Sequence, residues 1–141
     1  MTHTLDAAFT AVVIDGDDTF ADTLSLMLRQ ELGLRVLAIA GTVESGVAAC
    51  ACHQPSLLVL DTDLLSACGL PILATLAIVS PATAVIMVSR RSPCLECPFT
   101  RGPGIPIDLR LSKDLPRDEL AATLRNKVKR LMATRTVIPH A

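Results

Sequence analysis

Short apolar runs alternate along the chain with segments in which apolar residues recur at helical spacing. Five of these runs have the length and composition of buried strands, at residues 11–15, 34–40, 57–61, 84–88 and 107–111. Most of the runs are apolar on both faces, which is typical of parallel strands that helices cover on both sides. The pattern therefore predicts a doubly wound α/β domain with a five-stranded parallel sheet.

Helical segments lie between the predicted strands. The first runs from about residue 20 and ends at Gly33, and the second extends from residue 43 to about 52 with Thr42 as its cap. A third is expected at residues 69–79. Pro116 opens the last, which has an apolar stripe and a basic outer face: Leu120, Leu124, Val128 and Leu131 in the stripe, and Arg117, Arg125, Lys127 and Arg130 outside it.

Polar groups follow the predicted strands at one edge of the sheet. Asp15 ends the first strand, Asp61 the third and Ser89 the fourth, and Lys113 lies just past the fifth. Ligands of doubly wound sheets bind beyond the carboxyl ends of the strands, so we expect these four side chains to converge. The apolar strand in the stretch SLLVLDTD ends in the carboxylate of Asp61, which is either exposed at an edge or placed for chemistry.

Composition limits the classes of partner. Lys and Arg number 13 against 14 Asp and Glu, so there is no basic excess for nucleic acid, and with 2% aromatic residues there is little to stack on bases. Residues 64–89 carry no charge, which raises the alternative of a membrane span. Gly69, Pro71 and Pro81 interrupt this run, which favours a buried helix followed by a buried strand and no membrane contact.

Cysteine usage and the N-terminus bear on the compartment. The first eighteen residues lack a basic region before their apolar run, so they do not resemble a signal peptide. The five cysteines are an odd number, which favours reduced thiols over a disulfide framework. We therefore expect a cytoplasmic protein.

Four motifs in order at strand ends carry a family resemblance: VVIDGDD at 12–18, LLVLDTDLLSACG at 57–69, VIMVS at 85–89 and LSKD at 111–114. With them the chain resembles the receiver domain of bacterial two-component response regulators, of the CheY-like type. The resemblance covers about residues 9–133 and leaves 134–141 as a C-terminal tail. It implies the flavodoxin-like (CheY-like) doubly wound fold.

The resemblance also implies roles for individual residues. Asp61 would accept a phosphoryl group from a phosphohistidine on a histidine kinase or phosphotransfer protein. Asp15 and Asp61, with the backbone carbonyl of Asp63, would hold Mg²⁺, a hard cation that takes oxygen ligands. The hydroxyl of Ser89 and the ammonium of Lys113 would bind phosphoryl oxygens. The chain would then be a signalling protein, not an enzyme.

The acidic site departs from the family pattern at Gly16, where receivers carry a second acid. Taking Asp17 and Asp18 as the acidic pair instead would put the polar Asp22 on a core position of the first helix. With Asp15 as the first acid, Phe20 and Leu24 occupy the core-facing positions. Asp17 is left as a substitute metal ligand, and without it Mg²⁺ binding would be weaker.

Two arginines are further departures. Arg110 takes the place of the aromatic switch residue in the fifth strand, and Arg90 follows the fourth-strand hydroxyl where the family has a small residue. These guanidinium groups would either clamp a phosphoryl group or pair with Asp61 and block it. The sequence leaves both alternatives open.

Residues 91–106 contain four prolines and two glycines in the place of the family's fourth helix, so we expect an irregular loop there. This loop holds Cys94 and Cys97, a C-x-x-C pair that Cys68 could approach. Zinc or redox chemistry is one interpretation, and small apolar side chains filling a loop is the other. Cys50, Cys52 and His53 are expected to point away from the site.

The predicted helix at residues 69–79 has Thr75 as its main polar residue, although a surface helix normally has a polar face. Either the exposed part is small and tolerable, or a partner or a second copy of the chain covers it. We expect no DNA-binding output domain after the last helix, so the chain would be either a stand-alone receiver or a receiver excised from a longer regulator.

Three functions stay open at this stage. The first is a phosphorylated signalling receiver in a two-component phosphorelay. The second is a degenerate receiver that binds proteins, as a homodimer or with an output protein, independently of phosphorylation. The third and weakest is a C-x-x-C metal or thiol sensor. The sequence does not reveal the cognate kinase or the pathway.

Overall fold

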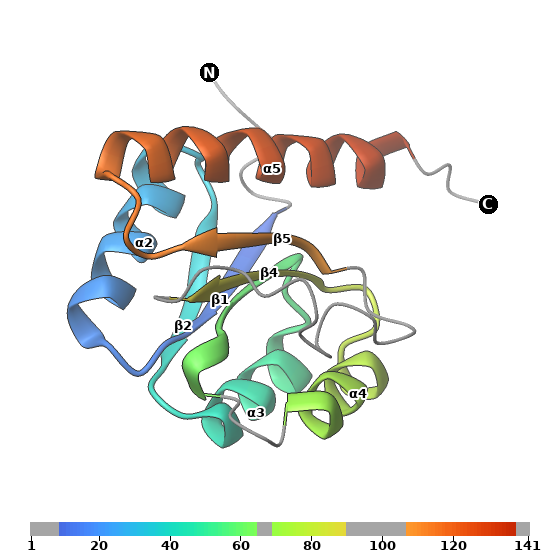
Figure 1. Ribbon diagram of the computed structural model, residues 1–141. Coiled ribbons are helices and arrows are strands. Elements are labelled where there is room, and N and C mark those ends of the chain that lie inside the picture. Colours follow the sequence, from blue (N-terminus) through green and yellow to red (C-terminus); the bar gives the residue numbers. More distant parts are fainter. Residues whose placement is uncertain (1–8, 65–68, 90–106, 138–141) are drawn as a thin grey trace.

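The computed structural model describes residues 9–64, 69–89 and 107–137. Ten elements follow in chain order: β1 (Thr10–Ile14), α2 (Asp18–Gln30), β2 (Arg35–Ala40), α3 (Val43–His53), β3 (Leu57–Asp61), η1 (Thr62–Leu64), α4 (Gly69–Val79), β4 (Ala84–Ser89), β5 (Ile107–Ser112) and α5 (Arg117–Val137). Strands and helices alternate from β1 to β4, and α5 follows β5 (Figure 1).

The five strands form one parallel sheet in the order β2-β1-β3-β4-β5. This arrangement confirms the predicted doubly wound fold. The strand order changes direction between β1 and β3, and ligands of such sheets bind at this switch point. Asp61 ends β3 and Asp15 follows β1, so both acids lie at the switch point.

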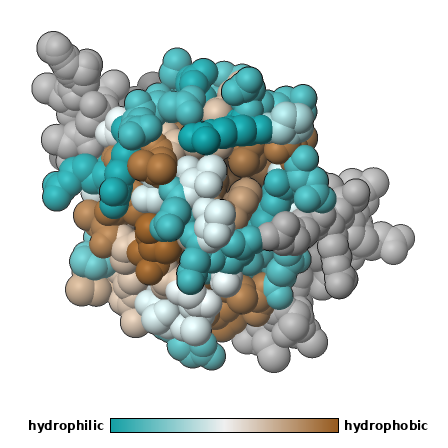
Figure 2. All heavy atoms as spheres, turned by 90° about the vertical axis from the view of Figure 1, so that its left-hand side faces the viewer, coloured by the Kyte–Doolittle hydropathy of each residue, from teal (hydrophilic) through white to brown (hydrophobic). Residues whose placement is uncertain are grey.

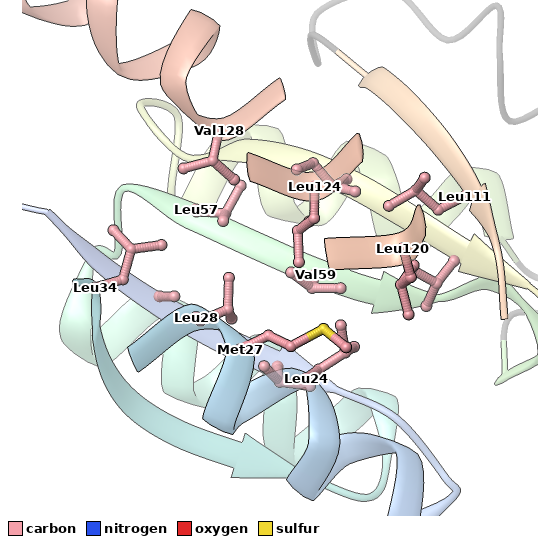
Figure 3. Close-up of a cluster of buried hydrophobic side chains, with 14 of the residues drawn as sticks. Leu24, Met27, Leu28, Leu34, Leu57, Val59, Leu111, Leu120, Leu124 and Val128 are labelled. Atoms are coloured by element: carbon pink, nitrogen blue, oxygen red, sulfur yellow. The ribbon is translucent and has the colours of Figure 1, made fainter. Parts of the chain in front are cut away.

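Two hydrophobic clusters lie on opposite faces of the sheet. The helices α2 and α5 cover one face and α3 and α4 the other, as Figure 1 shows. Along β3, Leu57 and Val59 belong to the first cluster, while Leu58 and Leu60 belong to the second. Figure 3 shows the first cluster, where Leu24 of α2 and Leu124 of α5 enclose Val59. Because β3 is covered on both faces, its run is continuously apolar.

Local chain chemistry sets the helix ends as the sequence predicted. The side chain of Thr42 accepts a hydrogen bond from the backbone N–H of Ser45 and caps α3. Gly33 has φ 71°, in the left-handed region that favours glycine, and lies in the turn after α2. The last helix begins after Pro116, as expected, and continues to Val137.

Gly46 allows α3 to lie close against β1. A Cβ atom at this position would collide with the side chain of Ile14, which is fully buried. A helix interior normally disfavours glycine by about 1 kcal/mol relative to alanine. At this position close packing against Ile14 outweighs that preference.

The helix α4 has the predicted bounds, and the uncharged run from residue 64 is a helix followed by a buried strand. Leu73 and Leu76 are buried, while Ala74, Thr75 and Ile78 are exposed, Ile78 by 79% of its surface. Two small side chains and one large apolar side chain are thus exposed in the described part of α4. Within the described residues, no helix is long and apolar enough to cross a membrane.

Several predictions concern residues outside the described part of the chain. These are the irregular loop at 91–106, the side chains of Arg90 and Arg110, and the positions of Cys68, Cys94 and Cys97. The backbone of Arg110 pairs with Met87 within the sheet.

Candidate functional site

Two acids and a lysine meet at the carboxyl end of the sheet. The Nζ atom of Lys113 lies 2.9 Å from Oδ1 of Asp15 and 3.1 Å from Oδ2 of Asp61. These side chains are only 2%, 0% and 5% exposed. One ammonium group thus neutralises part of the charge of two buried carboxylates, since a buried charge without a partner is costly.

Parallel strands explain why residues so far apart in the chain meet here. Asp15 follows β1, Asp61 ends β3, and Lys113 follows β5, so all three lie at the same edge of the sheet. The backbone N–H of Lys113 donates a hydrogen bond of 2.8 Å to the carbonyl of Ser89. This bond joins the residue after β5 to the end of β4. The predicted convergence is confirmed for these four residues.

The carboxylate of Asp61 is also held by its own loop. Its Oδ1 atom accepts a hydrogen bond of 3.0 Å from the backbone N–H of Asp63, in the short helical turn η1. Its other oxygen contacts Lys113. Asp61 is therefore fixed by a backbone donor on one oxygen and a cation on the other.

The side chain of Ser89 is hydrogen-bonded to an acid. Its hydroxyl donates to Oδ1 of Asp63 at 3.1 Å. The hydroxyl of Thr62 donates to the carbonyl of Val88 at 3.3 Å, so two side-chain bonds join η1 to the end of β4. The side chain of Asp63, which the sequence interpretation left without a role, thus holds the hydroxyl that was expected to bind phosphoryl oxygens.

Asp17 has a structural role that the sequence analysis did not assign. Its side chain accepts a hydrogen bond from the backbone N–H of Phe20 and caps α2, and its own N–H donates to Oδ1 of Asp15 at 2.8 Å. A carboxylate at a helix N-terminus is stabilised by the free N–H groups there. Asp17 therefore caps α2, and its role as a metal ligand stays a prediction.

The buried surroundings shift the pKa values of Asp15 and Lys113. Burial raises the pKa of the Asp15 carboxyl above its ordinary value of 3.8, and the hydrogen bonds from Asp17 and Lys113 reduce this effect without cancelling it. Burial alone would lower the pKa of Lys113. The hydrogen bonds and charges of Asp15 and Asp61 outweigh burial and raise that pKa above 10.5.

One oxygen of the site is suited to a cation. Within the described residues, Oδ2 of Asp15 is buried and has no hydrogen-bond partner. Buried polar atoms of this kind require an explanation, and an ion is one of them. The two carboxylates are hard oxygen ligands of the type Mg²⁺ prefers. However, no group of three or more His, Cys, Asp or Glu side chains comes together as a metal site in the part of the chain that the structure describes.

Gly16 leaves the site with one acid fewer than the receiver pattern has. It is exposed at the position where a second acid was expected, and a Cβ there would lie 3.0 Å from Cδ2 of Leu64.

The cysteines of α3 do not join the site. Cys50 is buried in the cluster beneath α3, where burial raises the pKa of its thiol to about 11, and Cys52 is exposed.

The sequence analysis missed one contact of the lysine. The ring of Phe20 lies beside the ammonium of Lys113, with Nζ 4.8 Å from the ring centroid. The helical spacing identified Phe20 as core-facing. Its contact with a residue that follows β5 depends on the tertiary arrangement.

The face of the molecule on the left in Figure 1, toward which the arrowheads of β4 and β5 point, is seen directly in Figure 2. Hydrophobic residues there lie in separate groups among hydrophilic ones. The rim of the sheet that holds the acids is thus part of a mixed surface.

Comparison with solved structures identifies the fold. The CheY-like receiver domain protein from Methanospirillum hungatei JF-1 has a TM-score of 0.71 at 21% identity, over 89% of this chain and 98% of that chain. The response regulator domain of Thermotoga maritima CheB has a TM-score of 0.74 at 18% identity, over 93% and 98%.

A DNA-binding response regulator of the LuxR family from Staphylococcus aureus has a TM-score of 0.66 at 19% identity, over 85% of this chain and 98% of that chain. No protein-family model and no curated protein matches the sequence. The chain therefore has the fold of response regulator receiver domains, as the motifs at the strand ends predicted.

Proposed function

We propose that the chain is a signalling receiver that accepts a phosphoryl group on Asp61 from a phosphohistidine of a histidine kinase or phosphotransfer protein. The observation that carries the proposal is the bridging of Asp15 and Asp61 by the buried Lys113. Phosphoryl transfer depends mainly on positioning and charge stabilisation, and this arrangement supplies both an aimed carboxylate and a fixed cation.

The transfer requires little covalent chemistry from the chain. A carboxylate oxygen of Asp61 attacks phosphorus, the P–N bond of the phosphohistidine breaks, and its electron pair remains on the imidazole, which takes up a proton from solvent. The product is an acyl phosphate on Asp61. Lys113 lies within reach to neutralise the phosphoryl oxygens, and Ser89 can join once its hydroxyl leaves Asp63. The chain is an acceptor in this scheme and not an enzyme.

Asp15 and Asp61, with the backbone carbonyl of Asp63, are the residues that would hold Mg²⁺. The unpartnered Oδ2 of Asp15 supports this assignment. When bound, the ion supplies positive charge to the phosphoryl oxygens. Because Gly16 brings no carboxylate, we expect the affinity to be weak.

The response regulators of similar fold give the wider context for this proposal. Phosphorylation of Asp61 would change the affinity for a partner, which would be an output protein or a second copy of the chain. We place this signalling in the cytoplasm, where a kinase domain and reduced cysteines are expected.

Incubation with acetyl phosphate and Mg²⁺, followed by intact-mass measurement, tests the proposal. We expect a mass increase of one phosphoryl group that hydroxylamine removes, since acyl phosphates react with it. The variant Asp61→Asn should show no such increase, because it lacks the acceptor oxygen and keeps a similar shape. A wild-type chain that stays unmodified would contradict the proposal.

A second function is favoured by two observations. The carboxylate of Asp63 holds the Ser89 hydroxyl, and Gly16 leaves the acidic site incomplete. A receiver with this site could bind a partner without phosphorylation. Partner binding that is equal for the wild-type chain and for Asp61→Asn, with no labelling by acetyl phosphate, would favour this degenerate binding module.

A further inference from the structure

Three groups surround the ammonium of Lys113. Oxygens of Asp15 and Asp61 accept its hydrogen bonds, and the ring of Phe20 lies 4.8 Å from Nζ, measured to the centroid. A cation within about 6 Å of an aromatic centroid is attracted by the ring, and more strongly where water is excluded. Because the lysine side chain is 2% exposed, this contact lies in the stronger regime.

A series of contacts that begins and ends at Asp15 sets the position of the Phe20 ring. The N–H of Asp17 donates to Oδ1 of Asp15, and the side chain of Asp17 accepts from the N–H of Phe20. The Phe20 ring contacts Lys113, and the ammonium of Lys113 donates a hydrogen bond to the same Oδ1 of Asp15. The cap that begins α2 therefore also places the ring beside the lysine.

The attraction of the Phe20 ring for Lys113 differs from the attraction of the two acids in one respect. When Asp61 becomes an acyl phosphate, or is otherwise neutralised, its attraction for Lys113 changes. The electrostatic attraction between the Phe20 ring and the ammonium of Lys113 does not depend on whether Asp61 is charged. The ring also offsets part of the cost of burying the ammonium, a cost that opposes its charged form.

We propose that Phe20 is a positioning residue, whose ring holds the ammonium of Lys113 in place by a cation–π interaction that does not depend on the charge of Asp61. Its consequence for phosphorylation rests on the proposed function. The contact itself does not, and it can be measured without any phosphoryl donor.

The first experiment measures the proton shifts of the Lys113 Cε methylene by NMR. We expect an upfield ring-current shift in the wild-type chain that Phe20→Leu removes and Phe20→Tyr retains. The control Phe9→Leu makes the same change in a buried ring at the other end of β1 and should leave the shift unchanged. Asp61→Asn should also retain it. Loss of the shift in Asp61→Asn would overturn the independence from Asp61, and a shift unchanged in Phe20→Leu would overturn the contact.

The second experiment is a double-mutant cycle of Phe20→Leu with Lys113→Met, read from urea unfolding. We expect the unfolding equilibrium constants to deviate from additivity by a factor on the order of ten, the size of a desolvated cation–π contact. The cycle of Phe9→Leu with Lys113→Met should be additive. Additivity in both cycles would contradict the proposal. If Lys113→Met does not fold, the NMR shifts of the first experiment decide whether Phe20 contacts Lys113.

The third experiment measures the rate of Asp61 labelling by acetyl phosphate. Phe20→Leu should slow labelling several-fold, and Phe20→Tyr should restore it. Phe9→Leu should match the wild-type rate although it also loses core packing. Equal slowing in Phe20→Leu and Phe9→Leu would reduce Phe20 to a structural role. If the wild-type chain is not labelled, the proposed function fails, and the first two experiments still decide whether Phe20 positions Lys113.

Discussion

Asp15 and Lys113 lie 98 positions apart in the chain, yet their side chains form a hydrogen bond of 2.9 Å from which water is excluded. The same ammonium contacts Asp61. A buried ion pair is weak support for stability as a whole, but removing one partner leaves a buried charge without compensation.

The first prediction follows from that asymmetry. Lys113→Met should lower the free energy of unfolding at neutral pH by about 3–5 kcal/mol, the usual cost of breaking a buried pair. Urea denaturation measures this loss. Lys129→Met removes an exposed lysine of α5 and serves as the control, with an expected change within about 0.5 kcal/mol. Similar effects of the two variants would show that the site does not depend on the charge of Lys113.

The second prediction concerns pH. Because the pKa of Asp15 is raised in the folded state, the folded chain binds more protons than the unfolded chain above pH 3.8. The contribution of Asp15 to stability is therefore lost as the pH rises through its folded pKa. Asp15→Asn lacks this titration, so its stability relative to wild type should improve with rising pH, by about 1.4 kcal/mol for each unit of the pKa shift.

Urea unfolding of both proteins from about pH 4 to 8, with a chelator present to exclude metal ions, measures this difference. A difference that moves in favour of the wild-type chain as the pH rises would contradict a raised pKa of Asp15.

The third prediction tests the missing acid. Gly16→Asp should tighten Mg²⁺ binding by about tenfold, since affinity at oxygen sites rises with the number of charged ligands. The new Cβ would press on Cδ2 of Leu64 at 3.0 Å, so Leu64 must shift slightly. Gly16→Ala causes the same contact without a carboxylate and is the matched control. Calorimetric titration with Mg²⁺ compares the three proteins, and equal affinities for the aspartate and alanine variants would sink the idea.

The fourth prediction concerns the hydrogen bond from Ser89 to Asp63. Asp63→Asn retains an acceptor for the hydroxyl but removes a negative charge that would repel an incoming phosphoryl group. We expect faster labelling of Asp61 by acetyl phosphate, by a few-fold, measured by intact mass over time. Thr62→Val removes the other side-chain bond between η1 and β4 without changing charge. If both variants are labelled equally fast, loosening of η1 and not the charge is responsible.

The fifth prediction concerns packing. Gly46→Ala should lower the free energy of unfolding by about 1–3 kcal/mol, because its Cβ would collide with the buried Ile14. Gly41 has nothing within 4 Å of such a Cβ, so Gly41→Ala is the control and should cost much less. Thermal unfolding of the two variants makes the comparison. A Gly46→Ala variant as stable as the wild type would show that Ile14 can move aside.

The sequence predicted the sheet and the place of the acids because both depend on local patterns. Apolar runs ending in Asp61 or Ser89 define a strand and its polar end together. The contacts of Asp63 with Ser89 and of Phe20 with Lys113 could not be predicted in this way. Each joins side chains from elements that are adjacent only in the folded chain.

Asp17 illustrates a different limit. The sequence places it next to the missing acid, which made it a candidate metal ligand, a role that remains a prediction. Its spacing of three residues from Phe20 is equally that of a helix cap, and the structure shows this bond. An acid before a helix serves either purpose, and only the direction of its side chain separates them.

The positions of β3 and β5 in the sheet give Asp61 and Lys113 different backbone support. Asp61 ends the central strand, which pairs with β1 on one side and β4 on the other, so its backbone opens only when the whole sheet does. Lys113 follows β5, which pairs only with β4 among the described residues. The position of Lys113 therefore depends more on its side-chain contacts with Asp15, Asp61 and Phe20 than on the strand that precedes it.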